Sequence, residues 1–460
     1  MARLLASGGL SARECMEAHI ARIGEVNPGV NAIVTLAAEE ALARAAAADE
    51  AQANHKVTGP LHGLPIAHKD LQPVRGVRTT FGSRIFRDYV PREDSLIVER
   101  FRAAGAICLG KTNTPEFGAG SQTYNEVFGA TLNPWDRTKT CGGSSGGAAV
   151  ALACRMLPIA DGTDLGGSLR NPASFCGVVG MRPSPGRVPT WPAPMAWSPL
   201  NVEGPLARTV EDVALVLSAI AGPDARSPLW LETPGAHFRG DPGRDFKGVR
   251  IAWWRDLGGV PVDRRVRAAV DAQRRVFESL GCIVEEAEPD FTGADQVFRT
   301  LRAYATAQRL ADHVRDHREL IKDTLLQEFE AGCRLTATEV GLAEAAHTEL
   351  YHRMRRFMER YEFFVLPVCQ VLPFDVRQHW PVEIDGVKLA TYIDWMKTCY
   401  YISAVGTPAI SVPCAFVEPA PGEPKLPVGL QIVGRHRDDW GVLQMAHAFE
   451  QALGLGACEP

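Results

Sequence analysis

The sequence lacks the features that mark several large classes of protein. No window approaches the ~18 uncharged apolar residues of a membrane-spanning helix, and the opening MARLLASGGLSARE has no apolar signal-peptide core. A formal net charge of −5 gives no reason to expect nucleic acid or an anionic membrane as a partner. The 11 cysteines contain no C-x-x-C pair, so neither a disulfide framework nor a zinc site is indicated. We predict no metal or other cofactor, and a reducing, cytoplasmic location.

Several catalytic motifs are also missing. The phosphate-binding pattern GxxxxGK[ST] does not occur. No lysine has a serine three residues before it, which excludes the S-x-x-K arrangement of penicillin-binding enzymes. His313 and His317 have the spacing of metal ligands on one helix face, but neither a third ligand nor the glutamate of H-E-x-x-H accompanies them. We therefore expect these histidines on a solvated face.

The pattern that is present is that of a globular α/β protein, with 46% hydrophobic and 22% charged residues. Strand-like runs at Leu64–His68 and Ile107–Leu109 bracket a helical segment at Glu93–Ala104. A second unit consists of a strand from Val249, a helix over Val262–Leu280 and a strand at 282–286. This alternation predicts an α/β sheet. Residues 292–361 are mostly helical and charged, and strands at 361–371, 409–412 and 428–433 are expected to complete the sheet.

Helices are expected at both ends of the chain. Ser11 and Glu14 form a capping box for a helix that ends near Asn27–Pro28. An alanine-rich helix is predicted over Leu36–Ala53. The last helix is expected at 440–452, with Leu443, Met445, Ala446 and Phe449 facing inward.

The most unusual stretch runs from Cys141 to Arg182. It opens with GGSSGG at Gly142–Gly147 and returns to glycine and serine in DGTDLGGSLRNP at Asp161–Pro172. Glycine lets the main chain approach a ligand closely, and successive N–H groups in such turns form a nest for negative charge. Serine hydroxyls beside such donors are the minimum that acyl transfer requires. We interpret this stretch as a candidate acyl-transfer site.

Two other interpretations of GGSSGG are weaker. A flexible linker is disfavoured because the six residues lie between a turn at Asn133–Trp135 and the helix-compatible AAVALA at Ala148–Ala153. The nucleophile-elbow pattern G-x-S-x-G also occurs here. An elbow, however, follows an apolar strand, whereas Asn133–Thr140 is a polar turn.

A serine nucleophile needs a base, and two lysines are candidates. Lys69 ends the strand-like GLPIAHK, and Lys111 ends AICLGK. A lysine drawn into an apolar pocket loses basicity and can act as a base. A strand-end lysine can equally extend its head to water. Composition and spacing do not choose between these two lysines.

Four blocks in order resemble the amidase signature family. They are GLPIAHKD, KTNTPEFGAGSQTYNEVFGATLNPW, CGGSSGGAAVALA and DGTDLGGSLRNPASFCGVVGMRPS, and they lie within Leu61–Pro185. LARTVEDVALVLSAIAG and LPVGLQIVGR extend the similarity. The resemblance implies an α/β fold with one large mixed β-sheet flanked by helices on both faces, in a single domain over residues 1–460. The signature core would occupy 61–220, a mostly helical variable segment 292–361, and a sheet-completing part 362–460.

The resemblance also implies a Ser-cisSer-Lys triad of Ser168, Ser144 and Lys69, with a cis peptide between Gly143 and Ser144. Lys111 falls on a block that is not catalytic. Ser168 would attack an amide carbonyl while Ser144 relays its proton to neutral Lys69, and an acyl-enzyme would then be hydrolysed. The oxyanion hole would be formed by the N–H groups of Leu165, Gly166, Gly167 and Ser168, with Ser145, Asp164 and Arg170 as supports.

The proposed base has an energetic requirement. Free lysine titrates near ~10.4, so lowering its pKa by ~3 units costs about 4 kcal/mol, which burial can supply. His68 departs from the family pattern, in which the residue before this lysine is commonly apolar. We expect a histidine that is hydrogen-bonded within the core; a role in tuning Lys69 is the alternative.

The segment VPTWPAPMAWSPLN at Val188–Asn201 is stiff and apolar. It can be a covering loop, or one wall of an acyl or aryl pocket with Trp191, Met195 and Trp197 as candidates. The second interpretation favours hydrophobic or aryl acylamides, with carbamates and esters as side substrates. For a small polar amide such as malonamate we would expect an arginine in the pocket. The expected partners are this small-molecule amide and water; the oligomeric state is not readable, and a homodimer stays open.

The alternative function is that of the glutaminase subunit of a tRNA-dependent amidotransferase, which the chain also resembles. That subunit generally carries Gln after the arginine that follows the nucleophile, and a YG pair downstream. Here Asn171 and Ser184–Gly186 occupy these positions. We therefore favour a free-standing amidohydrolase.

Overall fold

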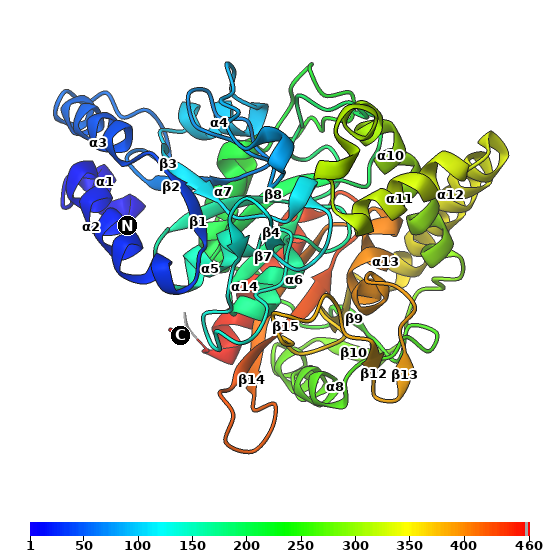
Figure 1. Ribbon diagram of the computed structural model, residues 1–460. Coiled ribbons are helices and arrows are strands. Elements are labelled where there is room, and N and C mark those ends of the chain that lie inside the picture. The colour runs from blue at the N-terminus through cyan, green and yellow to red at the C-terminus, as the bar shows by residue number, and fades with distance from the viewer. Residues whose placement is uncertain (456–458) are drawn as a thin grey trace.

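A large mixed sheet forms the centre of the molecule in the computed structural model, which describes residues 1–455 and 459–460. Its strand order is β10-β9-β11-β15-β14-β7-β8-β6 (Figure 1). The parallel neighbours are β9 with β10 and with β11, and the other pairs are antiparallel. The predicted mixed sheet is thus confirmed. Its strands are β6 Ile159–Asp164, β7 Val179–Arg182, β8 Val202–Ala207, β9 Arg250–Trp253, β10 Ile283–Glu286, β11 Phe363–Pro367, β14 Ala409–Val417 and β15 Leu426–Val433.

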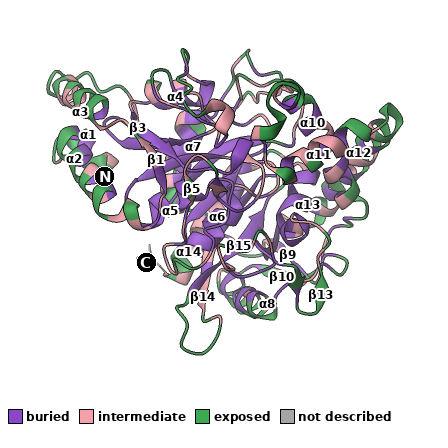
Figure 2. Ribbon diagram, in the orientation of Figure 1, coloured by how far each residue is buried: buried purple, intermediate pink, exposed green. Residues whose placement is uncertain are grey.

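Helices cover both faces of this sheet. Every residue of β7, β8, β11 and β15 is buried, and successive side chains of a strand point to opposite faces. Figure 2 shows the strands buried at the centre and exposed residues on the outer helices. The helices that contact the sheet include α5 Gly146–Ala153, α6 Arg170–Cys176, α7 Val210–Ile220, α8 Arg264–Asp271 and α14 Asp439–Leu453.

The first predicted strand–helix–strand unit belongs to a second, smaller sheet, which the sequence did not distinguish from the large one. β1 Ile33–Leu36, β2 Pro65–Lys69 and β3 Ile107–Thr112 form it in the order β1-β3-β2, with α4 Leu96–Ala103 as the connecting helix. β2 lies against β6 without joining its ladder. At its end, the Lys69 N–H donates to the Asp161 side chain, 2.7 Å away, in place of a neighbouring strand.

The predicted helices at both ends are confirmed. α2 Ala12–Val26 starts at the Ser11–Glu14 capping box, and the four predicted inward residues of α14 are fully buried. α3 Ala38–Ala53 begins two residues after β1, a strand that we did not predict. The helix predicted over Val262–Leu280 is divided into α8 and α9 Arg274–Ser279. It breaks because the Gln273 N–H bonds three residues back to Val270, which tightens the turn.

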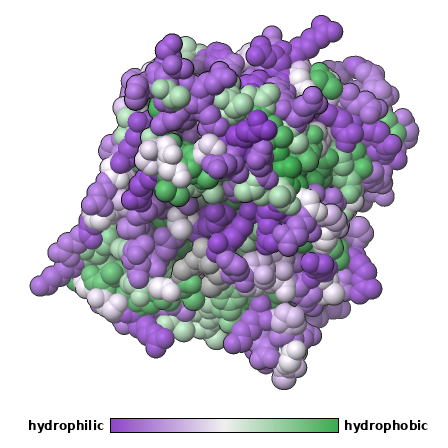
Figure 3. Space-filling model, turned by 90° about the vertical axis from the view of Figure 1, so that its left-hand side faces the viewer, coloured by the Kyte–Doolittle hydropathy of each residue, from purple (hydrophilic) through white to green (hydrophobic). Residues whose placement is uncertain are grey.

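Three long helices form the side of the molecule opposite α1 Ala2–Ser7, α2 and α3 (Figure 1). They are α10 Ala294–His317, α11 Asp323–Arg334 and α12 Ala337–Arg360, which confirms the helical segment predicted for 292–361. α13 Lys397–Val405 packs against α10 and α12. No helix within residues 1–455 and 459–460 has the length and apolar character needed to cross a membrane. On the face shown in Figure 3, apolar residues appear in separate areas among hydrophilic ones.

Candidate active site

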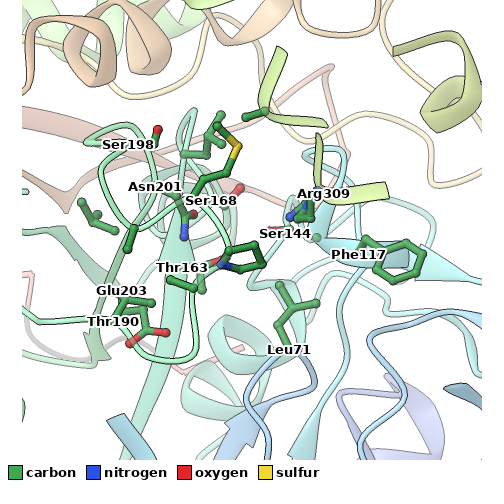
Figure 4. Close-up of a pocket in the computed structure, with 18 of the residues that line it drawn as sticks. Leu71, Phe117, Ser144, Thr163, Ser168, Thr190, Ser198, Asn201, Glu203 and Arg309 are labelled. Carbon is green, nitrogen blue, oxygen red and sulfur yellow. The ribbon is translucent and has the colours of Figure 1, made fainter. Parts of the chain in front are cut away.

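A cavity of about 410 Å³ lies where the predicted catalytic segments meet. The loop that carries Ser144 precedes α5, and Ser168 lies in the turn between β6 and α6. Both serines line the cavity (Figure 4). Ser168 is half-buried, whereas Ser144 is almost fully buried. Of these two hydroxyls, the one predicted to be the nucleophile is therefore the more accessible.

Lys69 lies beneath these serines at the end of β2. Its Nζ is 2.7 Å from Ser144 Oγ, 2.9 Å from Ser145 Oγ and 2.9 Å from Thr163 Oγ1. The lysine side chain is fully buried, and its three hydrogen-bond partners are uncharged hydroxyls. Sequence reasoning missed Thr163; its place in DGTD, five residues before Ser168, is the only available signal.

Burial lowers the pKa of Lys69 from 10.5 to about 7, although the negative charges of Asp161 and Asp164 oppose that shift. The cause is desolvation, because the ammonium form loses its hydration and its hydrogen-bond partners are hydroxyls rather than carboxylates. A substantial fraction of Lys69 is consequently neutral near pH 7, as a general base requires.

His68 is hydrogen-bonded within the core, as expected. Its Nδ1 is 2.5 Å from Asp161 Oδ2, and its ring packs edge-on against Phe101. The other oxygen of Asp161 accepts the backbone N–H of Lys69. His68 therefore orients the carboxylate that stands behind Lys69, so the two interpretations of this histidine are compatible.

The peptide between Gly143 and Ser144 is cis, in agreement with the resemblance. Hydroxyl groups hold the two carbonyls of this loop. Ser121 Oγ donates to the Gly143 carbonyl at 2.8 Å, and Thr123 Oγ1 donates to the Gly142 carbonyl at 2.9 Å. Asn171 Nδ2 in turn donates to Ser121 Oγ at 2.8 Å. The orientation of Ser144 is thus fixed by side chains from outside its own loop.

Asp164 anchors the turn that carries Ser168. Its carboxylate accepts two hydrogen bonds from Arg170, at 2.9 and 3.0 Å, and lies 3.3 Å from Arg182. Burial alone would raise the pKa of Asp164, but the two guanidinium groups outweigh it and hold that pKa below its usual range. The Arg170 guanidinium also donates to Ser403 and to the Cys399 carbonyl on α13. This ion-pair cluster ties the turn to the rest of the core.

The four predicted oxyanion donors do not have the same environment. Leu165, Gly166 and Ser168 line the cavity. The Gly167 N–H instead donates to Asp164 Oδ1 at 2.9 Å. Gly167 has a φ of 122°, a backbone conformation that favours glycine. Its positive φ turns the chain so that the preceding and following N–H groups can face the cavity.

The loop at 188–201 covers part of the cavity. Trp191 and Met195 line it. The Trp191 carbonyl accepts the Leu96 N–H, and the Arg226 guanidinium lies over the indole ring at 5.0 Å. The expectation for Trp197 was wrong, since this side chain is 77% exposed and does not line the cavity. The proline-rich turn directs it outward, away from Met195.

Helix α10 supplies the opposite wall, and the expectation for His313 was wrong. Its ring stacks on Phe117 with 5.5 Å between centroids, and it lines the cavity, whereas His317 is exposed. Two arginines of α10 also line the cavity, although we expected none for an apolar pocket. Arg302 is paired with Glu328 at 2.8 Å. Arg309 has no ion-pair partner in the part of the chain that the structure describes.

Lys111 has a different environment from Lys69. It is fully buried, but its Nζ bonds to the Gln72 carbonyl and to Thr79 Oγ1 and lies 3.8 Å from Asp70. It bonds to neither Ser144 nor Ser168. The choice that spacing left open is therefore resolved by geometry in favour of Lys69.

Fold and site together define a hydrolase with a serine and a buried lysine at the carboxyl ends of two strands. The family model described as Amidase matches residues 14–443. The chain therefore belongs to the amidase family and is a hydrolase that acts on amide bonds.

Similar proteins lead to the same class. An acylamidase of Rhodococcus erythropolis is 37% identical over 454 residues, covering 98% of this chain and 94% of that protein. A glutamyl-tRNA(Gln) amidotransferase subunit of Geobacillus stearothermophilus is 36% identical over 482 residues, with 99% and 97% covered. The crystal structure of a bacterial aryl acylamidase of the amidase signature family has a TM-score of 0.91 and 29% identity, covering 98% of this chain and 95% of that one.

Proposed function

We propose that this amidohydrolase cleaves hydrophobic or aryl acylamides through an acyl-enzyme on Ser168. The observation that carries the proposal is the fully buried Lys69 Nζ, 2.7 Å from Ser144 Oγ, beneath the cavity that exposes Ser168. An amine in this position can take a proton through a hydroxyl while the neighbouring hydroxyl attacks.

In the first step, Ser168 Oγ attacks the carbonyl carbon, and its proton passes to Ser144, whose own proton goes to neutral Lys69. The developing oxyanion is stabilised by main-chain N–H groups among Leu165, Gly166 and Ser168. Each such donor is worth about 10²–10³-fold in rate. Lys69 then returns a proton through Ser144 to the leaving amine. Water hydrolyses the acyl-enzyme by the same relay in reverse and releases the carboxylic acid.

The substrate class rests on the apolar lining of the cavity. Its walls include Leu71, Phe117, Trp191, Met195 and Phe298. Such a surface suits an aryl or alkyl group beside the scissile amide. Carbamates and esters share the tetrahedral chemistry and are expected to react more slowly or as side substrates.

The test is hydrolysis of 4-nitroacetanilide, followed by the release of 4-nitroaniline. Hydroxylamine added to the reaction should divert the acetyl group to acetohydroxamate, because an acyl-enzyme can be intercepted. Ser168→Ala and Ser144→Ala should lose turnover. Ser198→Ala is the matched control, since Ser198 lines the cavity but lies outside the triad. Turnover that survives in Ser168→Ala would refute the assignment.

The second candidate is the glutaminase subunit of an amidotransferase, which the 36% identity over 99% of the chain favours. Two measurements separate the candidates. A free-standing acylamidase should hydrolyse 4-nitroacetanilide far better than glutamine, and it should be active without a partner protein. Ten cysteines of the described chain are free thiols, which supports the predicted cytoplasmic location.

A further inference from the structure

A second carboxyl group lines the cavity and takes no part in the proposed relay. Glu203 lies on β8, directly opposite Thr163 of β6 in the antiparallel register. Directly paired residues project to the same face of a sheet, and Thr163 contacts Lys69. Glu203 therefore lies on the catalytic face of the sheet, although it is only 5% exposed.

One oxygen of this carboxyl group is held and the other is not. Gln72 Nε2 donates to Glu203 Oε1 at 2.9 Å, and Ser95 Oγ donates to Gln72 Oε1 at 3.1 Å, which fixes the orientation of the amide. Glu203 Oε2 has no hydrogen-bond partner among the described residues. A buried polar atom without a partner is costly, so a site that keeps one invites a ligand group that satisfies it.

Within residues 1–455 and 459–460, no cation forms an ion pair with Glu203. The cation that acts on it electrostatically is Arg100. The Arg100 guanidinium is committed to the carbonyls of Ile220, Gly222 and Pro223 and to Asp224. Burial raises the pKa of Glu203 to about 8, and the negative charge of Asp161 adds to that shift. A ligand that brings its own positive charge would supply what the protein does not.

The position of Glu203 indicates which part of the substrate would meet it. Because Ser144 returns the proton to the leaving amine, the leaving group must lie on the side of Ser144. In Figure 4, Glu203 and Thr190 lie to one side of Ser168, and Ser144 and Phe117 to the other. Glu203 thus faces the acyl side.

From this arrangement we propose that Glu203 binds an amino group on the acyl part of the substrate, so that preferred substrates are amides of amino acids rather than of plain fatty or aryl acids. The inference deepens, and rests on, the proposed acylamidase function. The ammonium group would donate to Oε2 while Gln72 holds Oε1. If the free carboxyl group carries a proton, binding releases that proton to solvent, so the charges balance.

The experiment compares ω-aminoacyl anilides, from glycine anilide to 6-aminohexananilide, with anilides whose amino group is replaced by methyl or hydroxyl. At least one chain length should be hydrolysed with a kcat/KM about tenfold or more above both analogues, since a hydrogen bond to a charged group is worth about 1.5–3 kcal/mol. Equal values for amine and methyl, or for amine and hydroxyl, would overturn the proposal. A preference seen only with amines on the leaving side, in N-(4-aminobutyl)benzamide over N-pentylbenzamide, would overturn it too.

Glu203→Gln is the decisive variant, because its carbonyl can still accept from Gln72 while its amide cannot pair with an ammonium. It should abolish the amine preference and leave the methyl analogue within about twofold. Glu93→Gln, which removes an exposed carboxyl group, should change neither. If the methyl anilides are not hydrolysed at all, the proposed function fails; if they are hydrolysed without an amine preference, only the role of Glu203 fails.

A pH series provides a readout that a merely structural glutamate would not give. The ratio of kcat/KM for amine over methyl substrate should rise with pH up to about 8 as Glu203 ionises. The titration of Lys69 divides out of this ratio. In Glu203→Gln the ratio should be flat, and a flat ratio in the unmodified protein would contradict the proposal.

Discussion

The floor and the walls of the cavity are built differently. The floor, which we define as Lys69, Ser144, Thr163 and the turn from Asp164 to Ser168, is mostly buried and cross-linked by hydrogen bonds from β2, β6 and α13. The walls, defined as the loop at 188–201 and helix α10, present half-buried apolar side chains and an arginine without an ion-pair partner among the described residues. The difference separates chemistry, which needs fixed distances, from recognition, which needs a shaped surface.

If this division is right, floor variants should change kcat and wall variants should change KM. Two lysines at adjacent strand ends allow the sharpest test. Lys69→Met removes the base and should lower kcat/KM by about 10³-fold or more, while the fold persists because only hydroxyl partners are left behind. Activity with 4-nitroacetanilide and the thermal unfolding midpoint would be measured together.

Lys111→Met is the matched control for that lysine. It leaves the buried carboxylate of Asp70 without its cation and should destabilise the protein by about 3 kcal/mol, with the residual folded enzyme still active. A floor that depends on Lys111 for chemistry would show the reverse, with lost turnover and an unchanged unfolding midpoint.

The next largest effect concerns pH. Lys69 must be neutral to accept a proton, and burial sets its pKa at about 7. Below that value the protonated fraction grows, so kcat/KM should fall about tenfold per pH unit and should level off above pH ~8. Rates between pH 5 and 9 on an uncharged anilide would show this limb. A limb centred near pH 10 would mean that Lys69 keeps its ordinary basicity.

Asp161→Asn sharpens the same point with a smaller shift. The Asp161 carboxylate raises the pKa of Lys69, so its removal should lower that pKa and move the acidic limb to lower pH, by about one unit. Because asparagine keeps an oxygen for the Lys69 N–H, the strand end should stay in place. A limb that moves to higher pH, or does not move, would show that Asp161 acts only as a structural anchor.

The sequence predicted the floor far better than the walls, for physical reasons. Ser144, Ser168 and Lys69 lie in segments whose glycines and buried strands leave little conformational choice, and family resemblance placed each residue. Thr163 was missed because its role depends on β6 lying against β2, a pairing between sheets that no local pattern encodes. His313 was assigned to solvent for the same reason, since Phe117 covers its ring from another part of the chain.

The smallest predicted effect separates two tryptophans of one wall. Trp191 lines the cavity and Trp197 is 77% exposed, although both lie in the same proline-rich loop. Trp191→Ala should raise KM for aryl substrates about five- to tenfold with little change in kcat, because it removes about 1 kcal/mol of apolar contact. Trp197→Ala should stay within twofold for both parameters, as a surface substitution does. If Trp191→Ala lowered kcat by orders of magnitude instead, the indole would be part of the floor, and the division between positioning and recognition would have to be redrawn around it.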